Sequence, residues 1–118
     1  MQVVCTRIEL KPNSMEAVRA WAREVTSRSN EVLQTLLAEG VTLESVFLDR
    51  VGDTDYLVYY MRADDLDHAH AVGPKLDLPI QHYHNRFKRE TWQQVTKLEC
   101  LADFTCESAP QGGATRSG

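Results

Sequence analysis

The segment formed by residues 79–92, PIQHYHNRFKRETW, holds the residue types best suited to chemistry. It carries His82 and His84, and an unperturbed imidazole titrates near pH 6.5, which makes histidine the usual group for proton transfer at neutral pH. We therefore take His84 as a candidate acid or base, with the adjacent Tyr83 as a possible hydrogen-bonding partner. The alternative interpretation is a histidine at the edge of the core, with its ring nitrogens bonded to a backbone carbonyl or a tyrosine hydroxyl.

The same histidines do not form a recognisable metal site. The proline and the apolar spacing of this segment predict a helix, and residues two apart on a helix point about 200° apart. His82 and His84 therefore cannot hold one ion together, and His68 and His70 have the same spacing. A helical ligand pair needs a partner four residues away, and no cysteine pair has zinc spacing either. We predict no metal and no cofactor, and a composite metal site built from separate elements is the alternative.

Charged side chains interrupt three apolar runs, at Arg7, Glu44 and Asp103. One interpretation is an ion-pair network inside a dimer, because charges within strands are unfavourable unless they are paired or exposed. The other is a polar ligand site in which Arg7 holds a carboxylate or phenolate with two hydrogen bonds. Aromatic residues could complete such a site, although tyrosines on strands more often pack a sheet. The candidate ligand-binding residues are Arg7, Glu44, Tyr59, Tyr60 and Trp92.

Composition excludes several classes of protein. The chain has 118 residues and a net charge of -4, so it lacks the basic field of a nucleic-acid-binding protein. No apolar run approaches the roughly 20 residues that span a bilayer, and the N-terminus does not resemble a secretory signal. The three cysteines have no disulfide or zinc pattern, which is typical of reduced thiols, and we predict a cytoplasmic protein. No glycine-rich phosphate loop or nucleophile elbow is present.

The periodicity of apolar residues predicts one domain over residues 1–106 and a disordered tail over 107–118. Most distinct is an amphipathic helix that starts at Met15 and ends at Gly40. The predicted elements, in order, are a strand at 3–10, that helix, strands at 41–50 and 55–63 joined by a hairpin, a helix from Asp64 or Asp65 to Gly73, a helix from Pro79, and a strand at 96–106.

This order predicts an α+β protein with the ferredoxin-like βαββαβ fold and an extra helix before the last strand. Helices would cover one face of a four-stranded antiparallel sheet. The run at 55–63 is apolar on both of its faces, and a strand of that kind is usually buried on both. A second copy of the sheet is the simplest cover, so we predict a homodimer that pairs as a dimeric α/β barrel.

The chain also resembles an uncharacterised bacterial family of unknown function, DUF6176, within the dimeric α/β-barrel superfamily. The stretches that carry the resemblance are RIELKPNSMEAVRAWAREV, EGVTLESVFLDR, YLVYYMRA and PIQHYHNRFKRETW. In the last of these, the residues that match the family pattern are Pro79, Ile80, Tyr83, His84, Phe87 and Lys88. The superfamily includes monooxygenases, lactone isomerases, haem peroxidase relatives and dimers without a known reaction, so the fold alone does not select a function.

Two functional hypotheses follow. The first is a homodimer without catalysis that binds a small apolar or aromatic ligand or serves as a structural or interaction module, with no nucleic-acid or membrane partner. The alternative is a cofactor-independent monooxygenase-like or isomerase-like enzyme, acting on a small aromatic or polyketide-like compound with His84 as the acid or base. Haem binding, with His84 as the axial ligand, is a weaker third possibility.

Overall fold

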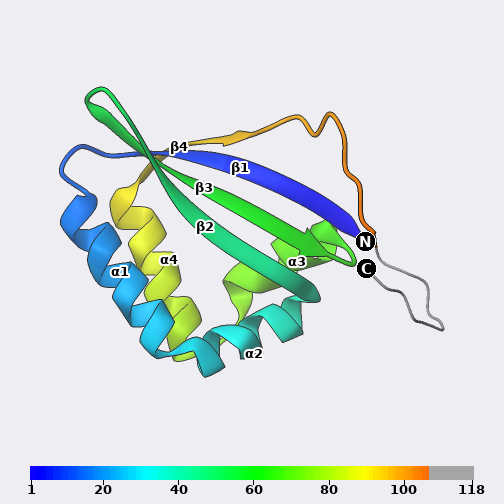
Figure 1. The fold of residues 1–118 in the computed structure, drawn as a ribbon. Coiled ribbons are helices and arrows are strands. Elements are labelled where there is room, and N and C mark those ends of the chain that lie inside the picture. Colours follow the sequence, from blue (N-terminus) through cyan, green and yellow to red (C-terminus); the bar gives the residue numbers. More distant parts are fainter. Residues whose placement is uncertain (107–118) are drawn as a thin grey trace.

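The computed structural model of the chain describes residues 1–106, and the predicted disordered tail lies outside the described residues. The fold is the predicted α+β fold (Figure 1). Its elements are β1 (Gln2–Leu10), α1 (Met15–Ser27), α2 (Ser29–Glu39), β2 (Val41–Val51), β3 (Thr54–Ala63), α3 (Leu66–Val72), the short 3₁₀ helix η1 (Gly73–Lys75), α4 (Pro79–Thr91) and β4 (Trp92–Lys97).

The four strands form one antiparallel sheet in the order β2-β3-β1-β4. This is the strand order of the ferredoxin-like motif, since the two strands at its centre are the first and third in the chain. The predicted hairpin is confirmed, because Val51 pairs with Thr54 and the turn between them contains Gly52 at φ 59°. Glycine adopts this left-handed conformation without strain.

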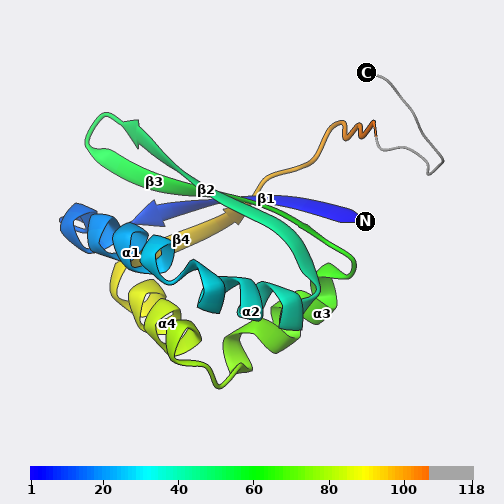
Figure 2. The same cartoon turned by 60° about the horizontal axis from the view of Figure 1, so that its bottom comes forward.

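All helices lie on one side of the sheet, as the sequence predicted (Figure 2). Along each strand, alternate side chains point toward them, and this is the face on which the core forms. The core cluster combines strand residues such as Ile8, Leu57 and Tyr59 with Val18 and Trp21 of α1 and with Phe87 of α4. No helix within residues 1–106 covers the opposite face of the sheet, where Asp103 of the segment after β4 contacts Arg62.

Replacing Leu57 with alanine is expected to lower the free energy of unfolding by about 3 kcal/mol. Leu57 is 2% exposed at the centre of the core, so its truncation leaves a void that the neighbours cannot fill. The matched control is Leu37→Ala on α2, where the leucine is 82% exposed. Urea denaturation of both variants measures the difference, and equal effects would contradict the described core.

The prediction of one long helix from Met15 to Gly40 was wrong. Arg28 interrupts it with φ -114° and ψ 37°, and α1 and α2 are separate helices. The Arg28 guanidinium bonds to Glu24 before the break at 3.0 Å and to Glu31 after it at 2.7 Å. The break lets the chain change direction, so that both helices follow the twisted sheet (Figure 2).

The predicted last strand is present, but its predicted bounds of 96–106 were wrong. The strand β4 begins at Trp92, directly after α4, and ends at Lys97. Beyond it, Leu98 donates its backbone N–H to the carbonyl of Cys5, and residues 99–106 have no regular structure. Leu101 and Phe104, whose apolar side chains suggested a strand, are 86% and 89% exposed.

The uncovered face of the sheet, which we call the open face, carries the other set of alternating side chains. Cys5 pairs with Tyr60 across it, and Phe47 pairs with Val58. Phe47 is 61% exposed, an unusual position for a large apolar side chain at the middle of a strand. Among residues 1–106, no helix is long and apolar enough to cross a bilayer.

Candidate functional site

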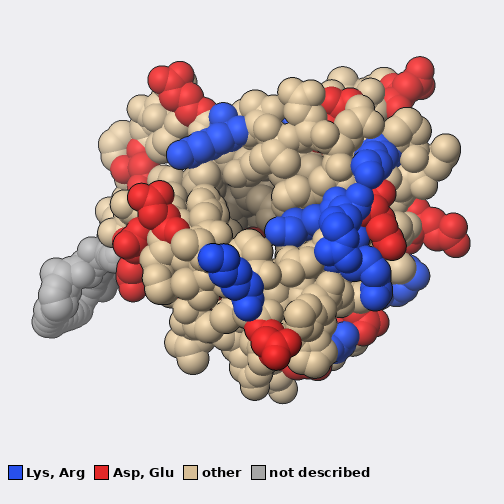
Figure 3. Space-filling model, turned by 180° about the vertical axis from the view of Figure 1, so that it is seen from behind, with Lys and Arg blue, Asp and Glu red and all other residues tan. Residues whose placement is uncertain are grey.

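A cavity of about 470 Å³ lies between the helices and the sheet. Figure 3 shows a hollow on the side turned away in Figure 1, with basic side chains beside it. Most of the lining is apolar and includes Val4, Ile8, Val25, Leu36, Val46 and Met61. The polar lining residues are Thr6, Thr35, Glu39, Glu44, Tyr59, His70, Gln81, His84, Lys88, Trp92 and Lys97.

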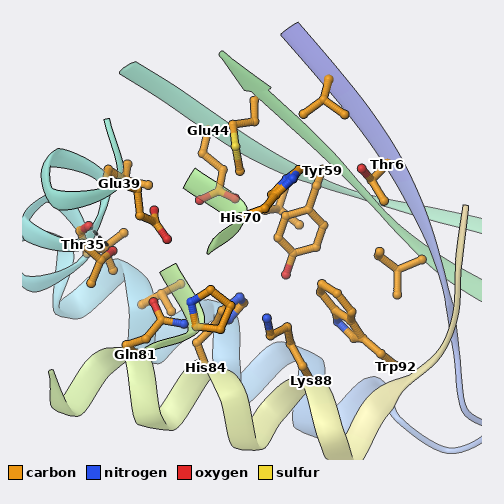
Figure 4. A pocket seen from close by; sticks show the side chains of 18 of the residues that line it. Thr6, Thr35, Glu39, Glu44, Tyr59, His70, Gln81, His84, Lys88 and Trp92 are labelled. Carbon is orange, nitrogen blue, oxygen red and sulfur yellow. Dashed lines mark hydrogen bonds between the residues drawn. The ribbon is translucent and has the colours of Figure 1, made fainter. Parts of the chain in front are cut away.

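Strand and helix geometry aim the polar groups into this cavity. In β2, Glu44 pairs with Met61 and lies two residues before Val46, which pairs with Tyr59, so all four side chains share the helix-facing side. In α4, His84 and Lys88 are four residues apart and therefore lie on one helix face. Figure 4 shows Glu44 and Tyr59 across the cavity from His84 and Lys88.

The ring of His84 is held in one orientation by Trp21. The indole Nε1–H of Trp21 donates to Nδ1 of His84 at 3.1 Å. Burial, with a further contribution from the Lys88 charge, lowers the pKa of His84 to about 4, so the ring is neutral at pH 7. Because Nδ1 accepts a hydrogen bond, the single ring proton resides on Nε2. His84 is therefore a hydrogen-bond donor at neutral pH, and it has no free lone pair to act as a base.

Two carboxyl groups enter the cavity from the opposite side (Figure 4). Burial, with a contribution from the Glu39 charge, raises the pKa of Glu44 to about 7. Burial also raises the pKa of Glu39, while the Lys88 charge opposes the shift of both. Lys88 is affected in the reverse sense, since burial lowers its pKa and the two glutamates oppose that change. The cavity therefore contains a carboxyl group that exchanges a proton near neutral pH.

Gly73 permits the position of Glu39. A β-carbon on Gly73 would collide with Oε2 of Glu39, so any side chain at this position would displace that carboxylate. Gly73 has an ordinary helical φ of -49°, which any residue can adopt. A glycine is required here because of the limited space beside Glu39, and not because of the backbone conformation.

Two polar groups at the cavity lack partners. The Tyr59 hydroxyl and the Trp92 indole N–H are buried without a hydrogen bond to any of residues 1–106. An unpaired buried polar group is unfavourable by about 1–3 kcal/mol, and so such groups are few in folded proteins. Burial, with a contribution from Glu44, raises the pKa of Tyr59 well above its usual value, which keeps the hydroxyl protonated.

The structure brings together four of the residues selected from the sequence, namely His84, Glu44, Tyr59 and Trp92. Tyr83 is not among the residues that line the cavity; it packs against the core cluster, and the Arg86 guanidinium lies 5.2 Å from its ring centroid. Helical neighbours diverge by about 100°, so adjacency to His84 in sequence does not place Tyr83 beside it.

Arg7 and Tyr60 lie on the open face. Arg7 forms an ion pair with Asp49 at 3.1 Å and lies 3.7 Å from the ring centroid of Tyr56. Tyr60 accepts a hydrogen bond from Arg62, which also pairs with Asp103 at 2.6 Å. Arg7, Glu44 and Asp103 therefore do not form one network, since each has a different environment.

Three charged residues of the site, Glu39, Lys88 and Lys97, were not among the residues selected from the sequence. Lys88 was recognisable in principle, because it lies four residues after His84 on the same helix face. Glu39 precedes the helix-ending Gly40, where a solvated carboxylate is usual, so no local pattern marks it. Within residues 1–106, no group of three histidine, cysteine, aspartate or glutamate side chains could hold a metal ion. His82 instead contacts Asp77 at the surface.

Comparison with known proteins identifies the family and confirms the fold. A family model described as a family of unknown function, DUF6176, matches residues 1–108, as the sequence resemblance indicated. No curated protein sequence matches the chain.

The structure is similar to that of L-rhamnose mutarotase FA22100 from Formosa agariphila, with a TM-score of 0.52 and 16% identity over 91% of this chain and 100% of that one. PA3566 from Pseudomonas aeruginosa has 18% identity over 85% and 93% of the two chains, and a TM-score of 0.49. NE2512, a protein of unknown function from Nitrosomonas europaea, has 19% identity over 90% and 94%, and a TM-score of 0.47. At these identities, the mutarotase supports the shared fold alone.

Proposed function

We propose that this protein, which belongs to the family of unknown function DUF6176, binds a small uncharged organic molecule. The binding site is the cavity between its sheet and its helices. The observation that carries the proposal is the pair of unpartnered groups at the cavity, the Tyr59 hydroxyl and the Trp92 N–H. A ligand oxygen would accept from both and remove their desolvation penalty. A largely apolar cavity with a few convergent polar groups is the usual form of a small-molecule site.

The lining indicates the chemistry of the ligand. Its apolar walls suit an aromatic or alicyclic body, and its donors suit a carbonyl or hydroxyl oxygen. The raised pKa values of Glu39 and Glu44 indicate that the cavity solvates negative charge poorly beside these two carboxyl groups. A second charge on the ligand would meet the same desolvation penalty, which favours an uncharged molecule.

Saturation-transfer NMR with 2-tetralone, an uncharged aromatic ketone, tests the proposal. The control variant is Val95→Trp, because Val95 lines the cavity and is 55% exposed, so that a larger side chain there would obstruct the cavity. We expect saturable binding to the native protein and at least tenfold weaker binding to the blocked variant. Equal binding to both proteins, or none to either, would contradict the assignment of the cavity.

Replacing Tyr59 with phenylalanine is expected to separate stability from binding. Removal of an unpartnered buried hydroxyl should raise the free energy of unfolding by about 1 kcal/mol. The same change removes a hydrogen-bond donor and should weaken 2-tetralone binding about fivefold. Thermal unfolding and NMR titration of one preparation measure both effects. A destabilised variant with unchanged affinity would indicate a structural role for the hydroxyl.

We further propose that two copies associate through the open face. Its apolar residues include Phe47 and Val58, which pair across β2 and β3. In residues 98–106, Leu101 and Phe104 are also largely exposed. Burial of such side chains against a second copy would follow from the hydrophobic effect. The unpaired cysteines Cys5, Cys100 and Cys106 fit a reducing compartment, which supports a cytoplasmic location.

A further inference from the structure

We propose that this cavity is catalytic and that Glu44 moves a proton between carbon atoms of an uncharged carbonyl compound, while His84 holds the carbonyl oxygen. The inference rests on the proposed function, since the substrate is a ligand of the same cavity. It assigns the acid and base role to Glu44 and not to His84, which was the sequence-based candidate.

The position of Glu44 supports this role. Its side chain points into the cavity from β2, and among residues 1–106 no hydrogen bond or ion pair engages its carboxylate (Figure 4). Structural carboxylates at such depth are normally paired, whereas a free one beside a cavity is typical of a reactive group. Its pKa of about 7 means that both protonation states are populated at neutral pH, as a group that removes and returns a proton requires.

The position of His84 supports the complementary role. Trp21 occupies Nδ1, so Nε2–H is the ring atom left to donate to a ligand. Lys88 lies one helical turn further along the same face and supplies a second N–H donor at the cavity. Fixed donors in a desolvated site stabilise an oxygen atom on which negative charge develops. The donors lie on α4 and the carboxyl group on β2, so a ligand between them meets both.

The reaction balances without an oxidant or reductant. The Glu44 carboxylate takes a proton from the carbon next to the carbonyl, which breaks a C–H bond and forms an O–H bond on Glu44. The electron pair of the C–H bond forms a C=C bond, and the carbonyl pair moves to the oxygen, which accepts hydrogen bonds from Nε2–H of His84 and from the Tyr59 hydroxyl, the donor already assigned to the ligand oxygen. Glu44 then returns the proton to the same carbon, or to a conjugated carbon two atoms further on, which yields exchange or isomerisation.

Several charged or titratable groups surround Glu44 and determine its pH dependence. They are Glu39 from α2, Tyr59 from β3, His70 from α3, His84 and Lys88 from α4, and Lys97 from β4. The charge of Glu39 raises the pKa of Glu44, and that of Lys88 lowers it. The rate should therefore rise as pH increases through about 7, and Glu39→Gln should move this rise to lower pH.

Deuterium exchange tests the proposal. The protein is incubated with 2-tetralone in D₂O, and ¹H NMR follows the loss of the methylene signals next to the carbonyl. We expect the native protein to accelerate exchange at least tenfold over buffer at pH 8, which is a modest effect for a positioned base. Glu44→Gln should lose this acceleration and still bind 2-tetralone. Glu90→Gln, a carboxylate exposed on α4, should retain it.

The outcomes separate the two proposals. Loss of exchange in Glu44→Gln with retained binding supports the inference, as does a lower pH midpoint in Glu39→Gln. Saturable binding without catalysed exchange, or exchange in Glu44→Gln at the native rate, overturns the role of Glu44 and leaves the ligand site intact. If 2-tetralone shows no binding that the Val95→Trp variant weakens, both the ligand site and this inference are overturned.

Discussion

Replacing Glu44 with glutamine is expected to raise the free energy of unfolding at pH 8 by about 2 kcal/mol and to leave it nearly unchanged at pH 4. Burial and the Glu39 charge raise the pKa of Glu44 to about 7 in the folded protein. In the unfolded chain the same carboxyl titrates near 4.3. The folded state therefore binds this proton more tightly, and the stability that it contributes below pH 4.3 is lost as pH rises through 7. Glutamine stays neutral and avoids that loss.

His84 gives the same variant a second signature. Burial lowers the pKa of His84 to about 4, whereas an unfolded histidine titrates near 6.5. The contribution of His84 to folding stability is present above pH 6.5 and is lost as pH falls through 4. Its pH dependence is therefore opposite in sign to that of Glu44. The two slopes oppose each other between about pH 4.3 and 6.5 in the native protein. Glu44→Gln removes one of the opposing contributions and leaves that of Glu39, so stability should rise more with pH over that interval than it does in the native protein.

Urea denaturation of the native protein and Glu44→Gln at half-unit intervals from pH 4 to 8 measures both effects. Glu90→Gln is the control, because Glu90 is exposed on the outer surface of α4. A Glu44→Gln variant that is no more stable than the native protein at pH 8 would show that Glu44 is solvated, contrary to the described cavity.

Replacing Phe47 with glutamate is expected to raise the dissociation constant of the proposed homodimer at least 100-fold, which corresponds to about 3 kcal/mol. Phe47 lies at the middle of β2 on the open face, opposite Val58. A second sheet placed there would remove the new carboxylate from water, and desolvation of a charge at an interface is strongly unfavourable.

Sedimentation equilibrium over a range of concentrations measures this effect. Leu37→Glu introduces the same charge at an exposed leucine of α2, on the side of the sheet away from the open face, and should remain dimeric. A native protein that is monomeric at about 100 μM, a concentration at which specific homodimers are assembled, would contradict the proposed association.

Most of the fold was predictable from the sequence because local patterns determine most of it. The amphipathic spacing of α1, the hairpin at Gly52 and Pro79 at the start of α4 each identify an element without reference to distant residues. The break at Arg28 was not predictable in this way, because neither proline nor glycine marks it. It depends on ion pairs made across the break and on the twist of a sheet formed elsewhere in the chain.

The predicted bounds of the last strand were wrong for a different physical reason. Residues 98–106 contain apolar residues at intervals that suggest a strand, but a strand also needs a neighbour with free backbone groups. Pairing with β1 ends after Leu98 donates to Cys5, and the side chains of Leu101 and Phe104 stay exposed. The presence of apolar residues in a sequence therefore does not by itself show that they are buried, or against which part of the structure.

The candidate site was predictable only in part. Glu44 drew attention because it interrupts an apolar strand, and His84 because it lies on the apolar face of its helix. That Trp21 occupies one nitrogen of His84 depends on a contact between residues 63 positions apart. The consequence, a donor in place of a base, could not be derived from residue types alone. The cavity beside Glu44 and His84 could not be derived from residue types either, because it results from the packing of all the elements.

The proposed site is tested most directly by the pKa of the Glu44 side chain, measured by following its carboxyl ¹³C resonance from pH 3 to 9. The signal is assigned by its absence in Glu44→Gln, and Glu90 provides an exposed carboxyl for comparison. We predict a midpoint near 7, as burial beside Glu39 in a poorly solvated cavity requires. A midpoint near 4.3, the ordinary value for glutamate, would show a solvated carboxylate and would contradict both the proposed ligand site and the proton transfer assigned to it.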